Sequence, residues 1–194
     1  MGRVIVVTGI PGTGKTTVCN ELMKLAEQIG RKIEVINYGS VMVKLSRKRG
    51  KSLHRDELRK SGLTFQRNLQ IKAAKVISKK TAGVEGDVIV DTHMSIKTVD
   101  GYWAGLPSHV LQVLNPDMFI LVEAEPHEVL SRRLKYTTRK RDKALEGEIA
   151  EEFLFSRLMA AACAVLTGAS VKIVKNPAGK QVGAAEEVLK LLAQ

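Results

Sequence analysis

Apolar residues along the chain gather in short continuous runs, and these runs alternate with longer segments of helical periodicity. The runs are rich in Val and Ile and predict strands at 3–8, 32–37, 87–91, 117–122 and 171–175. Uninterrupted apolar runs of this length are typical of strands buried on both faces of a parallel sheet. Helical periodicity predicts helices near 15–29, 40–49, 54–60, 63–82, 107–114, 126–136, 148–167 and 181–193.

This alternation predicts an α/β fold with three layers, in which helices flank a five-stranded parallel sheet and the crossovers are right-handed. We expect a single domain over residues 1–194, because no repeat and no long linker divides the chain. Two segments interrupt the alternation. Residues 92–107 are too long for an ordinary loop after a strand, and residues 135–147 are basic and polar. Long loops at the carboxyl ends of strands are often functional.

The first predicted strand runs directly into residues 9–16, which read Gly-Ile-Pro-Gly-Thr-Gly-Lys-Thr and form a complete Walker A loop. The strand before it and the helix after it are the context that this pattern requires. Glycines let backbone N–H groups turn toward a polyphosphate, and the helix N-terminus adds further donors. Lys15 can then reach the β- and γ-phosphates, and the Thr16 hydroxyl can bind Mg²⁺. The loop predicts a nucleoside triphosphate site in a P-loop NTPase fold.

Two carboxylates end predicted strands and are candidates for a magnesium site. Asp91 is the preferred one, usually acting through water opposite the Thr16 hydroxyl. Its alternative role is a helix cap or a plain surface residue. Glu123 ends the fourth predicted strand, where we expect it to be solvated or to cap the helix that follows Pro126.

An arginine-rich stretch follows the fourth strand. It contains Arg132, Arg133, Arg139, Arg141 and, on the next helix, Arg157. Taken alone, such a run is a solvated charged face. Phosphoryl transfer favours another interpretation, since its transition state spreads negative charge over the equatorial oxygens and arginines stabilise it. A short lid at about 135–147 would also exclude water from the reaction.

A third candidate region follows the second strand and extends over about 37–84. Ser40 could simply cap a surface helix. In a P-loop kinase, however, the helices at this place carry the acceptor nucleotide, and Arg55 or Arg59 would grip its phosphate. His93 lies in the presumed cleft, where a structural hydrogen bond and a phosphate contact are both open. The four histidines have no metal-ligand spacing.

Composition narrows the remaining function classes. The net charge of +11 allows nucleic-acid binding, but the positive charge is scattered and aromatic residues make up only 4% of the chain. Nucleic acid is therefore the weaker alternative. No apolar stretch reaches the length of a membrane span, and we expect no signal peptide, because the first predicted strand begins at residue 3. The two cysteines, Cys19 and Cys163, are expected to be reduced core residues, as in the cytoplasm.

Taken together, these segments resemble the archaeal-type adenylate kinases along essentially the whole chain. The Walker A loop is shared with many NTPases, so the specificity comes from the combination. The matching segments are 6–17, Ile-Asn-Tyr-Gly at 36–39, Arg-Asp-Glu-Leu-Arg-Lys at 55–60, Val-Asp-Thr-His at 90–93, Gly-Tyr-Trp-Ala-Gly-Leu-Pro at 101–107, Thr-Thr-Arg-Lys-Arg at 137–141 and the tail pattern at 164–173.

The resemblance implies reversible transfer of a phosphoryl group from MgATP to AMP, giving two ADP, by a cytoplasmic homotrimer. It places Arg132 near the ATP base and Asn176 in the turn at 176–179 that touches adenine. The residues that bind the ATP phosphates are then Gly9, Ile10, Pro11, Gly12, Thr13, Gly14, Lys15, Thr16 and Thr17. The arginines that close on the transferring phosphoryl group are Arg139, Arg141 and Arg157. The AMP side comprises Tyr38, Gly39, Arg59, Thr92, His93 and Lys97.

The chain lacks the Asp-Gly-Phe-Pro-Arg run of the bacterial and eukaryotic adenylate kinases, an inserted lid domain and a Cys₄ zinc site. A cytidylate or uridylate kinase is the alternative of the same class. A P-loop ATPase that acts on RNA or ribosomal particles is the alternative of a different class.

Overall fold

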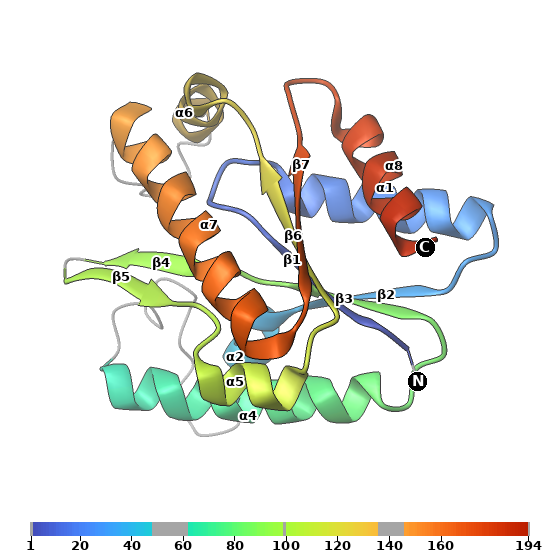
Figure 1. Ribbon diagram of the computed structural model, residues 1–194, viewed down its shortest axis with the longest axis vertical. Coiled ribbons are helices and arrows are strands. Elements are labelled where there is room, and N and C mark those ends of the chain that lie inside the picture. The colour runs from blue at the N-terminus through green and yellow to red at the C-terminus, as the bar shows by residue number, and fades with distance from the viewer. Residues whose placement is uncertain (1, 48–61, 99, 136–145, 194) are drawn as a thin grey trace.

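The computed structural model describes residues 2–47, 62–98, 100–135 and 146–193, and it contains a five-stranded parallel sheet between layers of helices (Figure 1). The strand order is β2-β3-β1-β6-β7, and all pairings are parallel. The strands are β1 (Val4–Thr8), β2 (Ile33–Asn37), β3 (Asp87–Asp91), β6 (Met118–Glu123) and β7 (Ser170–Lys175). The predicted fold class is confirmed. Both ends of every predicted strand lie within one residue of the observed ends.

The described helices follow the predicted order, although the start of α2 differs from the prediction. They are α1 (Lys15–Gln28), α2 (Tyr38–Arg47), α4 (Leu63–Thr81), α5 (Ser108–Leu114), α6 (Pro126–Lys135), α7 (Glu146–Thr167) and α8 (Gln181–Leu192). The predicted helix at 54–60 lies outside the described residues. The predicted start of α2 at residue 40 is wrong by two residues, because Asn37 rather than Ser40 caps it. The Asn37 Oδ1 atom accepts from the Ser40 N–H at 2.9 Å.

Residues 92–107 are not simply the long loop that was predicted. They contain an antiparallel hairpin, formed by β4 (Ser95–Thr98) and β5 (Gly101–Ala104). The Tyr102 ring of the hairpin stacks on Phe155 of α7, with ring centroids 4.0 Å apart. Two-stranded hairpins are marginal by themselves, so this tertiary contact supplies stability that no local pattern reveals.

Side chains of β1 show how the sheet divides the core. Val4 and Val6 pack in one cluster with residues of α2, α4, α5 and α7. Ile5 and Val7 pack in a second cluster with residues of α1 and α8. Because successive side chains of a strand point to opposite faces, one continuous apolar run supplies both layers.

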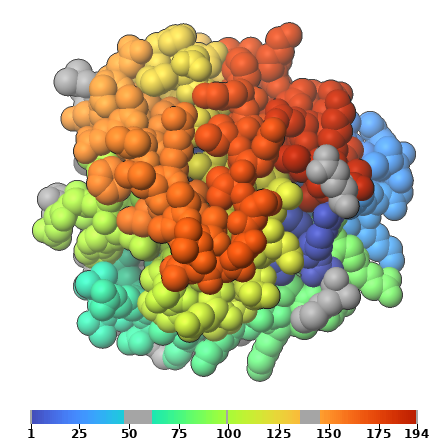
Figure 2. Space-filling model, in the orientation of Figure 1, coloured from blue at the N-terminus to red at the C-terminus, as the bar shows by residue number. Residues whose placement is uncertain are grey.

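A third, smaller cluster joins α6 to α7 beside the end of β6. Val129 of α6 packs with Ile149 and Phe153 of α7 and with Ile10 of the Walker A loop. The space-filling view shows α6 and the first half of α7 side by side at one edge of the molecule (Figure 2). Helix α6 therefore lies directly over the Walker A loop.

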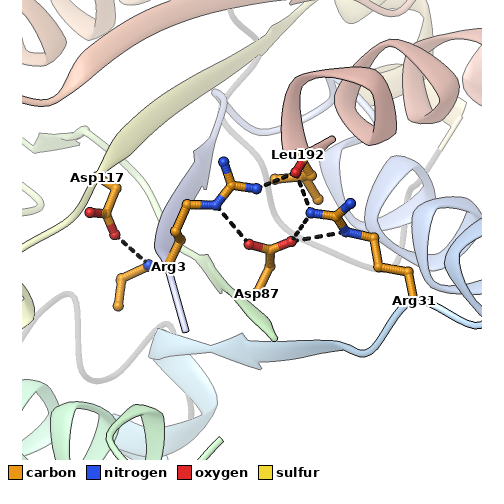
Figure 3. A network of polar contacts seen from close by, with 6 residues as sticks. Arg3, Arg31, Asp87, Asp117 and Leu192 are labelled. Atoms are coloured by element: carbon orange, nitrogen blue, oxygen red, sulfur yellow. Dashed lines mark hydrogen bonds and ion pairs between the residues drawn. The ribbon is translucent and has the colours of Figure 1, made fainter. Parts of the chain in front are cut away.

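At the opposite edge, near the amino ends of the strands, Asp87 binds two arginines (Figure 3). Its carboxylate accepts from Arg3 Nε at 3.0 Å and from Arg31 Nη2 at 2.7 Å. Both guanidinium groups also donate to the carbonyl oxygen of Leu192, which ends α8. This Asp87 cluster attaches the C-terminal helix to the edge of the sheet that is far from the Walker A loop.

Candidate active site

The Walker A loop connects β1 to α1 at the carboxyl edge of the sheet, where all five strands end. Gly12 and Gly14 have φ angles of 99° and 81°, in the left-handed region that side chains disfavour. A Cβ atom on Gly14 would also lie 2.6 Å from the amide nitrogen of Asn176. The loop therefore needs glycine at residue 14 for both backbone conformation and space.

Backbone carbonyls of the loop accept hydrogen bonds from the surrounding protein. Arg133 Nε donates to the Pro11 carbonyl at 2.7 Å, and Asn176 Nδ2 donates to that of Thr13, also at 2.7 Å. The His93 Nδ1 atom lies 2.9 Å from the Gly9 carbonyl oxygen, so this ring nitrogen must be the donor. With these carbonyls held by donors outside the loop, the N–H groups of the same peptides point the other way, as in an anion-binding nest.

Lys15, Asp91 and Asn37 meet at the ends of β3, β2 and the loop. The Lys15 ammonium forms an ion pair with Asp91 Oδ1, and Asn37 Nδ2 donates to Asp91 Oδ2 at 2.5 Å. Lys15 and Asp91 are buried. This arrangement results from the parallel register, in which Asp91 pairs with Val7 on one side and Asn37 on the other.

The predicted magnesium ligands fit what a Mg²⁺ site on a nucleotide requires. Mg²⁺ prefers oxygen ligands and usually retains water, so one or two protein oxygens suffice beside phosphates. The buried Asp91 carboxylate and the exposed Thr16, next to Lys15 on α1, provide such oxygens. Among the described residues no group of three or more His, Cys, Asp or Glu could hold a metal by itself.

Glu123 is neither solvated nor a helix cap, so the sequence-based expectation for it is wrong. It is buried, and its carboxylate accepts from Arg157 at 2.8 and 2.6 Å and from Lys175 at 3.3 Å. The hydrogen bond with this carboxylate raises the pKa of Arg157 above its ordinary value, and burial opposes that shift. Arg157 is about half exposed, at 47%. Its guanidinium is thus present at the carboxyl edge, attached to an anion.

Both arginines at the end of α6 contact the Walker A loop. Arg132 donates to the carbonyls of Thr13, at 3.2 Å, and of Asn176, at 3.0 Å. Arg133 binds Pro11, as described above, and also forms a two-pronged ion pair with Glu152 of α7 at 3.0 and 2.8 Å. The structure therefore brings Arg132 and Asn176 together beside the loop.

The described residues predicted for the acceptor side lie in different environments. The Tyr38 side chain is buried, its hydroxyl donates to the Gln70 carbonyl at 2.6 Å, and burial raises its pKa. Gly39 follows it in α2. Thr92 is buried after β3, and its N–H donates to the Val7 carbonyl at 3.1 Å. Lys97 of β4 lies 3.4 Å from Glu148 of α7. Arg59, Arg139 and Arg141 lie outside the described residues.

Three residues of this site had no individual role in the sequence-based prediction, although Arg133 was named in the arginine-rich stretch and Asn37 lies in the motif at 36–39. Asn37 orients Asp91, while Arg133 and Glu152 form a buried ion pair against the loop. Asn37 could have been found from the sequence, because it ends the predicted strand at 32–37 just as Asp91 ends the one at 87–91. The 19-residue separation of Arg133 and Glu152 has no local periodicity, so only the packing of α6 on α7 brings them together.

Comparison with known proteins now identifies the family. A family model described as an AAA domain matches residues 8–150. The adenylate kinase of Methanocaldococcus jannaschii is 44% identical over 174 residues, which cover 90% of each chain. The adenylate kinase of Thermoplasma acidophilum is 43% identical over 188 residues, which cover 97% of each chain. The chain belongs to the adenylate kinase family. The resemblance inferred from the motifs is thereby confirmed.

Solved structures related to this adenylate kinase family member support the fold alone, because their sequences are distant. Shikimate kinase from Acinetobacter baumannii, in complex with shikimate, aligns over 100% of this chain and 94% of its own, with a TM-score of 0.63 and 16% identity. TT1252 from Thermus thermophilus aligns over 99% of this chain and 96% of its own, with a TM-score of 0.59 and 13% identity. None of the described helices has the length and apolarity needed to cross a membrane.

Proposed function

We infer that this chain is an adenylate kinase, which transfers the γ-phosphoryl group of ATP to AMP and forms two ADP. The observation that carries the inference is the meeting of a Walker A loop, Lys15 and Asp91 at one edge of the sheet in a chain of this family. A phosphate oxygen of AMP attacks the γ-phosphorus, and the bond to the β–γ bridging oxygen breaks. No protein base is needed, because the acceptor phosphate is already ionised near neutral pH.

The chain's own residues bind and orient the phosphates. The Walker A loop surrounds the ATP phosphates with N–H groups, and the Lys15 ammonium exchanges its Asp91 partner for phosphate oxygens. Asp91 and Thr16 would hold Mg²⁺, which would neutralise phosphate charge. Arg157 stabilises the transferring group together with Arg139 and Arg141, which lie in the proposed lid at about 135–147. Arg132 and Asn176 form the ATP base side.

The acceptor nucleotide occupies the region at about 37–84 within the same single domain, at residues 1–194. Tyr38, Gly39, Arg59, Thr92, His93 and Lys97 are the residues proposed for AMP. For Tyr38 the buried ring supports a role in shaping the site, since its hydroxyl is held by Gln70. For His93 the hydrogen bond to Gly9 supports a position between the two nucleotides.

The proposal extends to a cytoplasmic homotrimer. Buried free thiols at Cys19 and Cys163 suit a reducing compartment. Exposed apolar side chains on α7 and the edge strand β7 supply a surface that subunits could bury: they are Leu154, Leu158, Val165, Leu166, Val171 and Ile173. Sedimentation equilibrium measures the subunit number, and a monomer at micromolar concentration would contradict a trimer.

The decisive assay incubates purified protein with MgATP and, separately, AMP, CMP, UMP and GMP, and measures ADP by a coupled reaction. Adenylate kinase activity requires ADP formation that depends on AMP and exceeds that with the other acceptors. Faster turnover with CMP or UMP would assign a different nucleoside monophosphate kinase. ATP hydrolysis without any acceptor, together with salt-sensitive RNA binding, would assign an ATPase instead.

A further inference from the structure

Arg133 is fixed in place by contacts that the phosphoryl-transfer mechanism above does not use. Its two terminal nitrogens bind the two oxygens of Glu152, and its Nε donates to the Pro11 carbonyl. Its side chain is only 8% exposed, and that of Glu152 is 11% exposed. One guanidinium thus links α6, α7 and the Walker A loop.

Stability alone does not account for a buried pair of this kind. Removing two charges from water is costly, and apolar residues of similar size often serve equally well. The third hydrogen bond, to Pro11, is what an apolar replacement could not supply. The guanidinium fork suits this task, because its five donors lie in one plane and can bind a carboxylate and a carbonyl together.

The Pro11 carbonyl belongs to the same planar peptide as the Gly12 N–H. In a trans peptide these two groups point in opposite directions, so a donor that fixes the carbonyl also fixes the N–H. Gly12 has a φ of 99°, and glycine permits this peptide to rotate more easily than other residues do. Rotation would turn a carbonyl oxygen, with its negative partial charge, toward the triphosphate.

We propose that Arg133, oriented by Glu152, is a positioning residue that holds the Pro11–Gly12 peptide so that the Gly12 N–H faces the ATP phosphates. The proposal rests on the ATP site of the proposed function. It does not require that Arg133 touches the nucleotide. It predicts that loss of the hydrogen bond to Pro11 weakens ATP binding specifically and leaves AMP binding intact.

The key variant is the double substitution Arg133→Met with Glu152→Met. It removes the donor to Pro11 without leaving a buried charge unpaired, so the protein should retain its fold. Arg133→Met alone leaves the Glu152 carboxylate buried and should lower Tm as well. Glu152→Gln retains an acceptor for Arg133 and should have the mildest effect.

The Asp87 cluster provides a matched control. Arg31 also binds a buried carboxylate with two nitrogens and donates to a backbone carbonyl, that of Leu192, far from the nucleotide site. Arg31→Met should therefore lower Tm and leave the affinity for ATP within about twofold of wild type. This control separates loss of an arginine clamp from loss of the clamp on the Walker A loop.

The measurement is calorimetric titration with ATP and, separately, with AMP, plus Tm for each variant. We expect the double variant to raise the Kd for ATP about tenfold and to change that for AMP by less than twofold, at nearly wild-type Tm. An unchanged Kd for ATP in the double variant, or equal losses for ATP and AMP, would overturn the proposal. A double variant that fails to fold would shift the decision to Glu152→Gln, where an ATP-specific loss of about threefold is expected. Because ATP binding needs no turnover, the ATP titration is independent of whether AMP is the acceptor.

Discussion

Two clusters at opposite edges of the sheet use the same side-chain chemistry on different backbone targets. In both, arginine binds a buried carboxylate with two nitrogens and donates to a main-chain carbonyl. Arg31 with Asp87 fixes the last turn of α8 at the amino ends of the strands (Figure 3). Arg133 with Glu152 fixes the Walker A loop at the carboxyl ends.

The two clusters differ in the structural role of the carbonyl group that the arginine binds. At the end of α8 the Leu192 carbonyl lacks a helical partner, and a cation there stabilises the helix through its dipole. In the Walker A loop the Pro11 carbonyl, bound by Arg133, belongs to a loop whose N–H groups can face an anionic ligand. One cluster should therefore contribute mainly to stability, and the other mainly to the shape of a binding site.

The largest expected effect is at the carboxyl edge. Lys15→Met should lower kcat on the order of 10³-fold, since a cation that stabilises the transferring phosphoryl group is lost. The coupled ADP assay measures it, and circular dichroism checks the fold. Lys24→Met, which changes an exposed lysine of the same helix, should have wild-type kcat. Retention of a third of the activity by Lys15→Met would contradict the assigned role.

At the amino edge, Asp87→Asn should reduce stability instead of activity. The buried carboxylate that joins Arg3 and Arg31 is lost, at a cost of about 3 kcal/mol and roughly 10 °C in Tm. Thermal unfolding measures the loss. The values of kcat and KM at 25 °C should stay within twofold of wild type, and a selective rise in KM for ATP would break the distinction between the two edges.

Two glycines with similar backbone conformations sharpen the same distinction. Gly14 has a φ of 81° and Gly168 a φ of 73°, so alanine at either position costs about 1–2 kcal/mol. Only at Gly14 would the new Cβ atom meet another group, the Asn176 amide; around Gly168 nothing lies within 4 Å. Gly14→Ala should therefore raise KM for ATP about tenfold, while Gly168→Ala should lower only Tm. Equal KM values would show that Asn176 adjusts without effect on the loop.

The smallest effect concerns the buried thiols. Burial raises the pKa of Cys19 to about 11, against a smaller opposing effect of Lys15, and it raises that of Cys163 to about 11 as well. Each thiol has its ordinary pKa near 9 when unfolded, so its contribution to stability is complete below pH 9 and is lost as pH rises toward 11. At pH 10 the loss should be about 1 kcal/mol for each thiol.

Urea denaturation at pH 8 and pH 10 tests this pH dependence. The variant Cys163→Ala removes one of the two buried thiols. It should therefore lose less stability between these two pH values than wild type. An identical pH dependence in both proteins would contradict the raised pKa of the Cys163 thiol.

Local patterns of the sequence predicted much of this molecule. The Val/Ile runs placed five strands, because a strand buried on both faces must be apolar throughout. The Walker A pattern placed Lys15 and Thr16, because its glycines, lysine and hydroxyl are adjacent in the chain. Asp91 was also predictable, because it ends a strand. That strand, β3, lies beside β1 in the sheet, so its carboxyl end meets the Walker A loop.

Tertiary structure decided the partners of the charged residues. The sequence alone left Glu123 as a solvated or capping residue, but β7 and α7 surround it with Lys175 and Arg157. It also gave no sign that Arg133 would meet Glu152 and Pro11. Backbone propensity and apolar periodicity act over neighbouring residues, whereas an ion pair depends on the distance between segments far apart in the chain. The sequence by itself therefore determined the fold and the phosphate loop, and the packing of α6 and α7 determined what holds that loop in shape.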